Sequence, residues 1–150
     1  MDLVISGEGR AHYGESTYRC ALGRAGVRAA KSEGDGASPA GTFTFLEVMF
    51  RSDRHHTPAT KLPCRPILQT DGWCDAPYDP AYNRLVTLPY PASSERLYRD
   101  DGLYDIIVVI SHNYSPVTPD AGSAIFMHIA GGADYPPTEG CIALALHDLR

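Results

Sequence analysis

A histidine and a cysteine near the C-terminal end of the sequence have the types and spacing of a nucleophilic pair. His128 ends a short apolar run, Ala124–Met127, and Cys141 follows a loop rich in glycine and proline. A free cysteine has a pKa of about 8.5, so only a few per cent is thiolate at neutral pH. A histidine within hydrogen-bond reach can act as the general base that removes the thiol proton. The pattern therefore predicts attack of the Cys141 sulfur on a carbonyl, assisted by His128.

The residues around Cys141 predict how its sulfur is activated. Thr138 is a typical helix N-cap, Glu139 follows it, and an apolar run continues behind them. Cys141 is then expected in the first turn of a helix, where unpaired N–H groups and the helix dipole favour the thiolate. Gly140 leaves the backbone uncovered, so its N–H and that of Cys141 are expected to bind a developing oxyanion.

Two motifs resemble those of the YkuD-type L,D-transpeptidases, cysteine acyltransferases that act on peptidoglycan stem peptides. The first is His128 followed by Thr138-Glu-Gly-Cys141. The second runs from Lys31 to Phe43 and reads Lys-Ser-Glu-Gly-Asp-Gly-Ala-Ser-Pro-Ala-Gly-Thr-Phe, similar to the family's Thr/Ser-Pro-x-Gly-x-Phe segment. The motifs stand in the family's order, and together they cover residues 31–144.

Several positions depart from the family pattern and indicate a divergent branch. Glu139 stands where the family commonly has a histidine before Gly-Cys, and Ile129 stands where a glycine usually follows the catalytic histidine. Ala143 and Leu144 replace the arginine or asparagine that is often found after the cysteine. The spacing from His128 to the cysteine is also shorter than usual.

The resemblance implies a mainly β fold, a flattened β-sandwich or open barrel with a helix following the catalytic cysteine. It also implies a Cys141 thioester formed with a stem tetrapeptide that carries a diamino acid at its third position. An amine acceptor then gives cross-links or D-amino-acid exchange. No cofactor or metal is needed, the expected location is the periplasm or cell envelope, and family members also react with carbapenems. The alternatives are an L,D-carboxypeptidase or amidase with the same dyad, and a non-catalytic wall-binding module.

Five residues are candidate substrate contacts, among them Thr138 and Glu139 beside the cysteine. Trp73, the one tryptophan, either covers the core or stacks on a substrate. Arg84 either binds a substrate carboxylate in place of the missing arginine or is a solvated surface residue. His112 follows an aliphatic run, and it is either a rival base or a loop histidine bonded to backbone.

Short strands are expected to position these residues, because the chain has 12 prolines and 14 glycines among its 150 residues. In residues 42–50 the apolar alternation slips between Phe45 and Val48, which indicates a bulge. The aliphatic run Ile106–Ile110 predicts a strand buried on both faces. If it lies beside the strand that ends at His128, both strand ends are expected to open into one cleft. Strands are expected at residues 2–6, 17–22, 42–50, 84–88, 103–111 and 124–128.

The segments between these strands are expected to be largely irregular. Residues 8–15 predict a turn, and residues 31–41 predict a loop whose glycines permit close packing beneath the site. Residues 51–91 are loop-like and long, which suggests a wall or lid over the cleft. Residues 93–99 predict a helical turn, and the C-terminal helix is expected to be cut short at Arg150.

Length and charge limit the classes of protein to which the chain can belong. Its 150 residues predict a single domain, residues 1–150, with a proper core. The net charge of −5 and the lack of a basic run argue against nucleic-acid binding. No apolar run is long enough to span a membrane. The N-terminus, with Asp2, Glu8 and Arg10, does not resemble a signal peptide. A trimmed signal, another export route and a substrate inside the cell all stay open, as does the oligomeric state.

Three further cysteines have structural interpretations. Cys64 and Cys74 are close enough in sequence for a loop disulfide, although two free thiols are the simpler interpretation. Cys20 lies in a strand-like run and is expected in the core. A zinc site from the two cysteines with His55 and His56 lacks paired Cys-x-x-Cys spacing, so no metal is expected.

Overall fold

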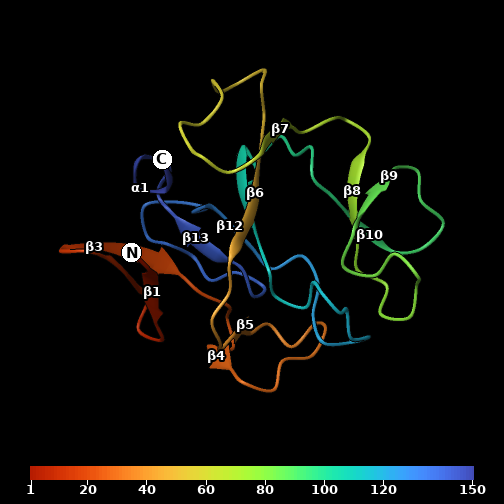
Figure 1. Ribbon diagram of the computed structural model, residues 1–150, viewed down its shortest axis with the longest axis horizontal. Coiled ribbons are helices and arrows are strands. Elements are labelled where there is room, and N and C mark those ends of the chain that lie inside the picture. Colours follow the sequence, from red (N-terminus) through yellow and green to blue (C-terminus); the bar gives the residue numbers. More distant parts are fainter.

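The computed structural model describes residues 1–150 and is mainly β, as the sequence and its family resemblance predict (Figure 1). One short helix, α1 (Leu146–Leu149), follows the last strand. The strands in chain order are β1 (Leu3–Ser6), β2 (Arg10–Tyr13), β3 (Ser16–Ala21), β4 (Val27–Arg28), β5 (Ser38–Pro39), β6 (Phe45–Phe50), β7 (Cys64–Pro66), β8 (Asp71–Cys74), β9 (Leu85–Thr87), β10 (Ser94–Arg96), β11 (Ile106–Ile110), β12 (Phe126–Ile129) and β13 (Ile142–Leu144).

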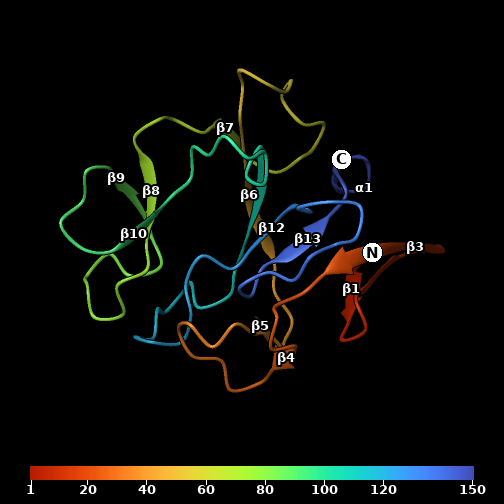
Figure 2. The ribbon, with the colours of Figure 1, turned by 180° about the vertical axis from the view of Figure 1, so that it is seen from behind.

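Eight strands form one mixed sheet in the order β1-β2-β3-β13-β12-β11-β6-β7. A three-stranded sheet has the order β10-β8-β9, and β4 pairs with β5. In Figures 1 and 2 the three-stranded sheet lies to one side of the central strands β6 and β12, and the N-terminal strands, which form one end of the main sheet, lie to the other side. The expected bulge is confirmed, because Val109 pairs with Glu47 while Ile110 pairs with Phe45, so one residue of β6 has no partner.

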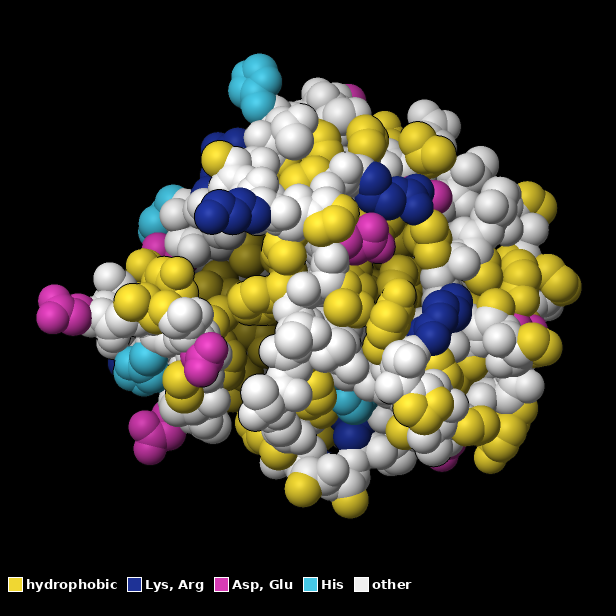
Figure 3. All heavy atoms as spheres, viewed as in Figure 1, with side chains coloured by type: hydrophobic (Ala, Val, Ile, Leu, Met, Phe, Trp, Pro, Cys, Tyr) yellow, Lys and Arg dark blue, Asp and Glu magenta, His cyan; other side chains and the backbone are white.

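The main sheet buries a hydrophobic core on each face, because side chains alternate along its central strands. On one face Phe126 and Met49 pack with Trp73 of β8. On the other face Met127 and Ile142 pack with residues of the N-terminal strands. Figure 3 shows hydrophobic side chains gathered in a hollow beside those strands. The face that carries Phe126 holds the candidate site.

Several local predictions are wrong because strand pairing outweighs the local sequence signal. The expected turn at residues 8–15 contains β2, which pairs with both β1 and β3. The expected helical turn at residues 93–99 contains β10, which pairs with β8. Residues 51–91, expected to be largely loop, contribute the two unpredicted strands β7 and β8, whereas β9 lies within the strand expected at residues 84–88.

The segment after Cys141 also differs from its prediction. Ile142–Leu144 is a buried strand that pairs in parallel with β12 and antiparallel with β3. A three-residue apolar run between two strands is better buried in the sheet than on a helix surface. The helix therefore follows the cysteine only from Leu146, and Thr138 does not cap it.

The four cysteines are free thiols, including Cys64 and Cys74. Cys20 is buried, as expected for a core residue. Helix α1 is neither long enough nor apolar enough to cross a membrane.

Candidate active site

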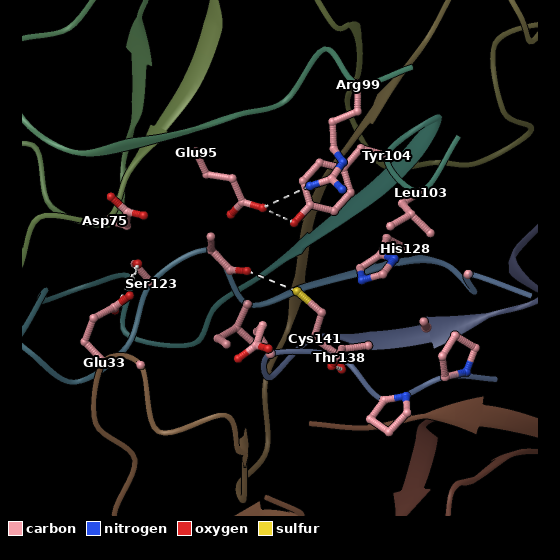
Figure 4. Close-up of a pocket in the computed structure, with 18 of the residues that line it drawn as sticks. Glu33, Asp75, Glu95, Arg99, Leu103, Tyr104, Ser123, His128, Thr138 and Cys141 are labelled. Carbon is pink, nitrogen blue, oxygen red and sulfur yellow. Dashed lines mark hydrogen bonds and ion pairs between the residues drawn. The ribbon is translucent and has the colours of Figure 1, made fainter. Parts of the chain in front are cut away.

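The register of β12 against β13 places His128 and Cys141 on the same face of the sheet. The two strands are parallel, with Met127 opposite Ile142 and His128 opposite Ala143. Because side chains alternate along a strand, Cys141 projects to the same side as Ala143 and His128. Both side chains border one cavity of about 430 Å³ (Figure 4). The structure thus brings the predicted pair together in one cavity.

The cavity has a mixed charged and apolar lining. Thr138 and Glu139, two of the predicted substrate contacts, border it. The other charged residues that line it are Lys31, Glu33, Asp75, Glu95 and Arg99. Three carboxyl groups therefore gather at the end of the cavity away from Thr138, where Figure 4 shows Glu33, Asp75 and Glu95.

The Cys141 sulfur is held between two backbone groups. The thiol donates to Ala124 O at 3.2 Å, and Phe126 N–H donates to the sulfur at 3.4 Å. Burial raises the pKa of Cys141 to about 12, and the hydrogen bond from Phe126 acts in the opposite direction. The expected thiolate at a helix N-terminus is therefore wrong. The resting residue is a protonated thiol that needs a base.

The His128 imidazole, which borders the same cavity, has a nitrogen that can accept a proton. Its Nδ1 lies 2.9 Å from Ile129 O. A carbonyl only accepts, so Nδ1 carries the hydrogen and Nε2 keeps its lone pair. Burial lowers the pKa of His128 below its ordinary value of 6.5, although the bond to Ile129 opposes this. The ring is therefore neutral at pH 7. The Tyr104 ring meets it edge-on, with the centroids 5.3 Å apart.

The peptide turn before Cys141 depends on Gly140. Its φ is 142°, and a Cβ there would lie 2.7 Å from Ala37 O. Gly140 N–H donates to Thr138 Oγ1 at 3.1 Å, and that hydroxyl donates to Cys141 O at 2.6 Å. Of the two amides expected to bind an oxyanion, the Gly140 amide is thus already occupied. The Cys141 N–H is the amide that remains for this role.

The motif from Lys31 to Phe43 packs against this turn and is hydrogen-bonded to it, as predicted. Ser38 is buried, and its hydroxyl accepts from Gly23 N–H at 2.9 Å while donating to Gly140 O at 2.8 Å. Both of its hydrogen bonds join backbone segments distant in sequence. Ser38 therefore fixes the peptide plane that connects Gly140 to Cys141.

Asn83 holds the backbone segment on the other side of the Cys141 sulfur. The spacing of residues in the sequence did not predict this role. Its Oδ1 accepts from Trp73 Nε1–H at 2.8 Å and from Ala124 N–H at 3.1 Å. Its Nδ2 donates to the carbonyls of His112 and Asn113 at 3.2 and 2.7 Å. All the hydrogen-bonding capacity of this amide is used. Asn83 thereby ties the backbone that accepts the thiol hydrogen to the core.

Three predicted substrate contacts do not border the cavity. Trp73 is in the core, with its ring edge-on to Phe126 at 5.0 Å between centroids. Its core interpretation is therefore the right one. Arg84 stacks over the ring of Tyr114 and donates to the carbonyls of Tyr114 and Asn83. The Arg84 guanidinium is thus bound by neighbouring protein groups and does not border the cavity.

His112 lies at the opposite end of the site from His128, because β11 and β12 are antiparallel. The two strand ends therefore do not open into one cleft, and that prediction is wrong. His112 Nε2 is 3.0 Å from Ala121 O, and burial lowers the His112 pKa. It is the backbone-bonded histidine of the two interpretations.

Glu139 lies at the exposed rim of the cavity. Its carboxylate accepts from Arg24 Nε at 3.0 Å, and both side chains are largely exposed. Exposed ion pairs contribute little stability. Glu139 therefore remains available to a ligand at the rim.

Tyr104 and Glu95 border the cavity without having been predicted. Tyr104 O–H donates to Glu95 Oε1 at 2.5 Å. Burial raises the pKa of both groups. Glu95 lies on a three-residue strand of the small sheet, and Tyr104 precedes β11. Neither residue belongs to a sequence motif that spacing alone reveals.

The comparison with known families agrees with the resemblance found in the sequence. The sequence model of one family, described as the L,D-transpeptidase catalytic domain (YkuD), matches residues 8–150. No curated protein and no solved structure matches the chain. The matched range contains the segment from Lys31 to Phe43, both strands of the site, and Cys141.

Proposed function

This chain belongs to the YkuD family of L,D-transpeptidase catalytic domains, and we propose that it is a cysteine acyltransferase acting on peptidoglycan stem peptides. The observation that carries this proposal is the shared face of His128 and Cys141, which border one cavity. Covalent acyl transfer requires at least a nucleophile and a base that can reach the same substrate, and one cavity holds both here. Residues 1–150 would form one catalytic domain, active in the periplasm or cell envelope.

In the proposed reaction His128 Nε2 takes the thiol proton, and the sulfur attacks the carbonyl that precedes a terminal D-amino acid. The Cys141 N–H stabilises the oxyanion. The C–N bond then breaks, and the departing amine takes its proton from the imidazolium. The thioester that remains is resolved by an amine or by water. Thr138 orients the Cys141 carbonyl, and Glu139 faces the substrate at the rim.

Proton transfer from the resting thiol is costly in this site. Burial raises the Cys141 pKa to about 12 and lowers the His128 pKa from its ordinary value, so both shifts disfavour the thiolate–imidazolium pair. The resting thiol is therefore expected to stay protonated until attack on the substrate follows the proton transfer.

The acceptor decides which product forms. An amine gives cross-linking or D-amino-acid exchange, whereas water gives carboxypeptidase or amidase activity. The cavity is partly open to solvent, so water reaches the thioester unless a bound acceptor excludes it. Product analysis with and without an added amine separates the two.

The test is thioester formation at Cys141. The protein is incubated with a purified stem tetrapeptide, or with a carbapenem, and its intact mass is followed. We expect a covalent adduct on the wild-type protein and none on Cys141→Ala. Cys64→Ala is the matched control, because Cys64 lies on β7 and does not border the cavity. An adduct on Cys141→Ala would assign the nucleophile to another residue, whereas no adduct on the wild type would support a non-catalytic wall-binding module.

A further inference from the structure

A phenol and a carboxyl group border the cavity together with the thiol and are not used by the proposed reaction. Tyr104 O–H donates to Glu95 Oε1 at 2.5 Å, and Figure 4 shows the pair facing the cavity above the Cys141 sulfur. The Tyr104 side chain is 6% exposed. Tyr104 and Cys141 pack in the same buried cluster and border the same cavity, and the Tyr104 hydroxyl acts to lower the pKa of the thiol. Its one proton is nevertheless committed to Glu95 in this structure.

A negatively charged Glu95 carboxylate destabilises the Cys141 thiolate. Its negative charge raises the pKa of Cys141. Burial raises the pKa of Glu95 itself, and the carboxylates of Asp75 and Glu33 add to that effect. The hydrogen bond from Tyr104 and the positive charge of Arg99 oppose it, but the pKa is raised overall. The carboxyl group therefore takes up a proton more readily than an ordinary glutamate.

Two cations face the same region, and each already has a carboxylate partner. Arg99 Nη1 is 4.0 Å from Glu95 Oε1, but its Nη2 is 2.5 Å from Asp101. Lys31 is buried, and its ammonium donates to Asp35 at 2.6 Å. Neither cation forms a close ion pair with Glu95. Protonation is then the direct way to neutralise the Glu95 carboxylate.

We propose that Tyr104 is a further catalytic residue that donates a hydrogen bond to the Cys141 thiolate, and that Glu95 is the positioning residue that directs it. When Glu95 takes a proton from solvent, its carboxylic acid donates to the Tyr104 oxygen. The Tyr104 O–H is then released and turns to the sulfur. The proton comes from hydronium, whose O–H bond breaks as the Glu95 O–H bond forms, and no other covalent bond changes. His128 still takes the thiol proton, and the thiolate gains a second donor beside Phe126 N–H.

This arrangement addresses the main difficulty of the site, the high pKa of the thiol. A neutral Glu95 removes a nearby negative charge, and a donated O–H stabilises the sulfur anion. Both effects favour the thiolate. A hydrogen bond to a charged group changes an equilibrium by about 10- to 100-fold. Tyr104 is thereby expected to change the reactive fraction of Cys141 by about that factor.

The experiment measures the alkylation rate of Cys141 by iodoacetamide between pH 5 and 9, followed by intact mass against a Cys141→Ala background. Tyr104→Phe keeps the ring and loses the donor, so it is expected to slow alkylation about 10- to 100-fold at pH 7. Glu95→Gln mimics the neutral acid, so it is expected to speed alkylation by about tenfold at pH 7, and this gain over the wild type is expected to shrink as the pH falls and the wild-type Glu95 takes up its own proton. The controls Tyr98→Phe and Glu8→Gln lose the same groups outside the cavity, and their rates are expected to stay unchanged.

The double variant separates a hydrogen-bond role from simple charge repulsion. If Glu95 acts only as a charge, Glu95→Gln is faster while Tyr104→Phe keeps the wild-type rate, and the proposal is overturned. A slower Glu95→Gln also overturns it. In the proposed arrangement, adding Tyr104→Phe removes most of the gain from Glu95→Gln. Thermal melts check that each variant is folded, and Tyr104→Leu serves if Tyr104→Phe is not.

The assignment rests on the proposed function for its nucleophile, but alkylation needs no stem peptide. A failure of peptide acylation with the expected alkylation rates would refute the substrate and leave the Tyr104 role standing. If the stem peptide acylates Cys141 but the alkylation rates differ from those expected, thioester formation stands and the role of Tyr104 is refuted. With a stem tetrapeptide, Tyr104→Phe is expected to lower kcat and leave KM unchanged, because the hydrogen bond forms to the thiolate.

Discussion

Asn83 and Ala124 both have positive φ, at 56° and 52°, and a hydrogen bond from Ala124 N–H to Asn83 Oδ1 at 3.1 Å joins them. An alanine in this left-handed region costs roughly 1 kcal/mol or more, so the surroundings must hold it there. The carbonyl of Ala124 accepts the Cys141 thiol hydrogen at 3.2 Å. The amide of Asn83 thus maintains the backbone conformation that orients the thiol.

Asn83→Ala is expected to destabilise the protein by about 3 kcal/mol or more. The substitution leaves the buried donors Trp73 Nε1–H and Ala124 N–H without an acceptor, at about 1–3 kcal/mol each. Guanidinium unfolding followed by tryptophan fluorescence measures the change. Gln69→Ala, at an exposed side chain, is expected to change stability by less than about 0.5 kcal/mol. A loss below about 1 kcal/mol for Asn83→Ala would show that this network is not needed.

The sequence predicts those strands of the fold whose signal is local. The aliphatic run of β11 and the apolar alternation of β6 with its bulge are both found as expected. β8 was missed, because its residues Asp71–Cys74 are buried through pairing with β9 and β10 rather than through their own hydrophobicity. At Thr138 a genuine capping pattern is overridden, because Ile142–Leu144 fills the gap between β12 and β3.

The candidate site divides in the same way. His128 and Cys141 lie at adjacent strands and border one cavity, as expected. The thiolate expected at Cys141 is wrong, because no helix starts at the cysteine. Asn83, Glu95 and Tyr104 reach the site from segments far away in sequence. Their side chains act through contacts that only the folded backbone creates, so residue type and spacing did not reveal them.

Gly140→Ala is expected to cost about 2–4 kcal/mol of stability and to lower thioester formation. A Cβ would lie 2.7 Å from Ala37 O and 3.0 Å from Ile125 Cδ1, at a φ of 142° that suits glycine. Relief of the clash would shift the amide of Cys141. Gly7→Ala is the matched control, since no atom lies within 4 Å of its added Cβ. Equal unfolding free energies for the two variants would contradict the close packing described.

The buried Lys31–Asp35 pair is expected to make stability depend on pH on the acid side. Their side chains are 5% and 6% exposed. Burial raises the pKa of Asp35, but hydrogen bonds from Lys31 and from the amides of Ser32 and Ala37 outweigh it, so the pKa is lowered overall. A carboxylate with a lowered folded-state pKa stabilises the protein above its unfolded value near 3.8, and this stability is lost as the pH falls further.

Unfolding free energies measured from pH 6 to pH 2.5 test the acid dependence. Asp35→Asn is expected to cost about 3–5 kcal/mol at pH 6, because it leaves a buried ammonium unpaired, and to flatten the decline below pH 4. Asp2→Asn, at an exposed carboxylate, should keep the wild-type profile. A decline of equal steepness in Asp35→Asn would assign the acid sensitivity to other carboxyl groups.

The pH dependence of thioester formation is expected to follow the protonation of the His128 imidazole. Burial lowers its pKa below 6.5, and only the neutral ring can accept the thiol proton. The acylation rate should therefore be level near pH 7 and fall as the pH drops through the lowered pKa. His128→Ala should reduce acylation at pH 7 by about 10²- to 10⁴-fold and abolish this acid limb. His112→Ala is the matched control, because His112 bonds to Ala121 O at the far end of the strands. If His112→Ala removes the limb while His128→Ala keeps it, the base is His112, and the shared face of His128 and Cys141 has no role in proton transfer.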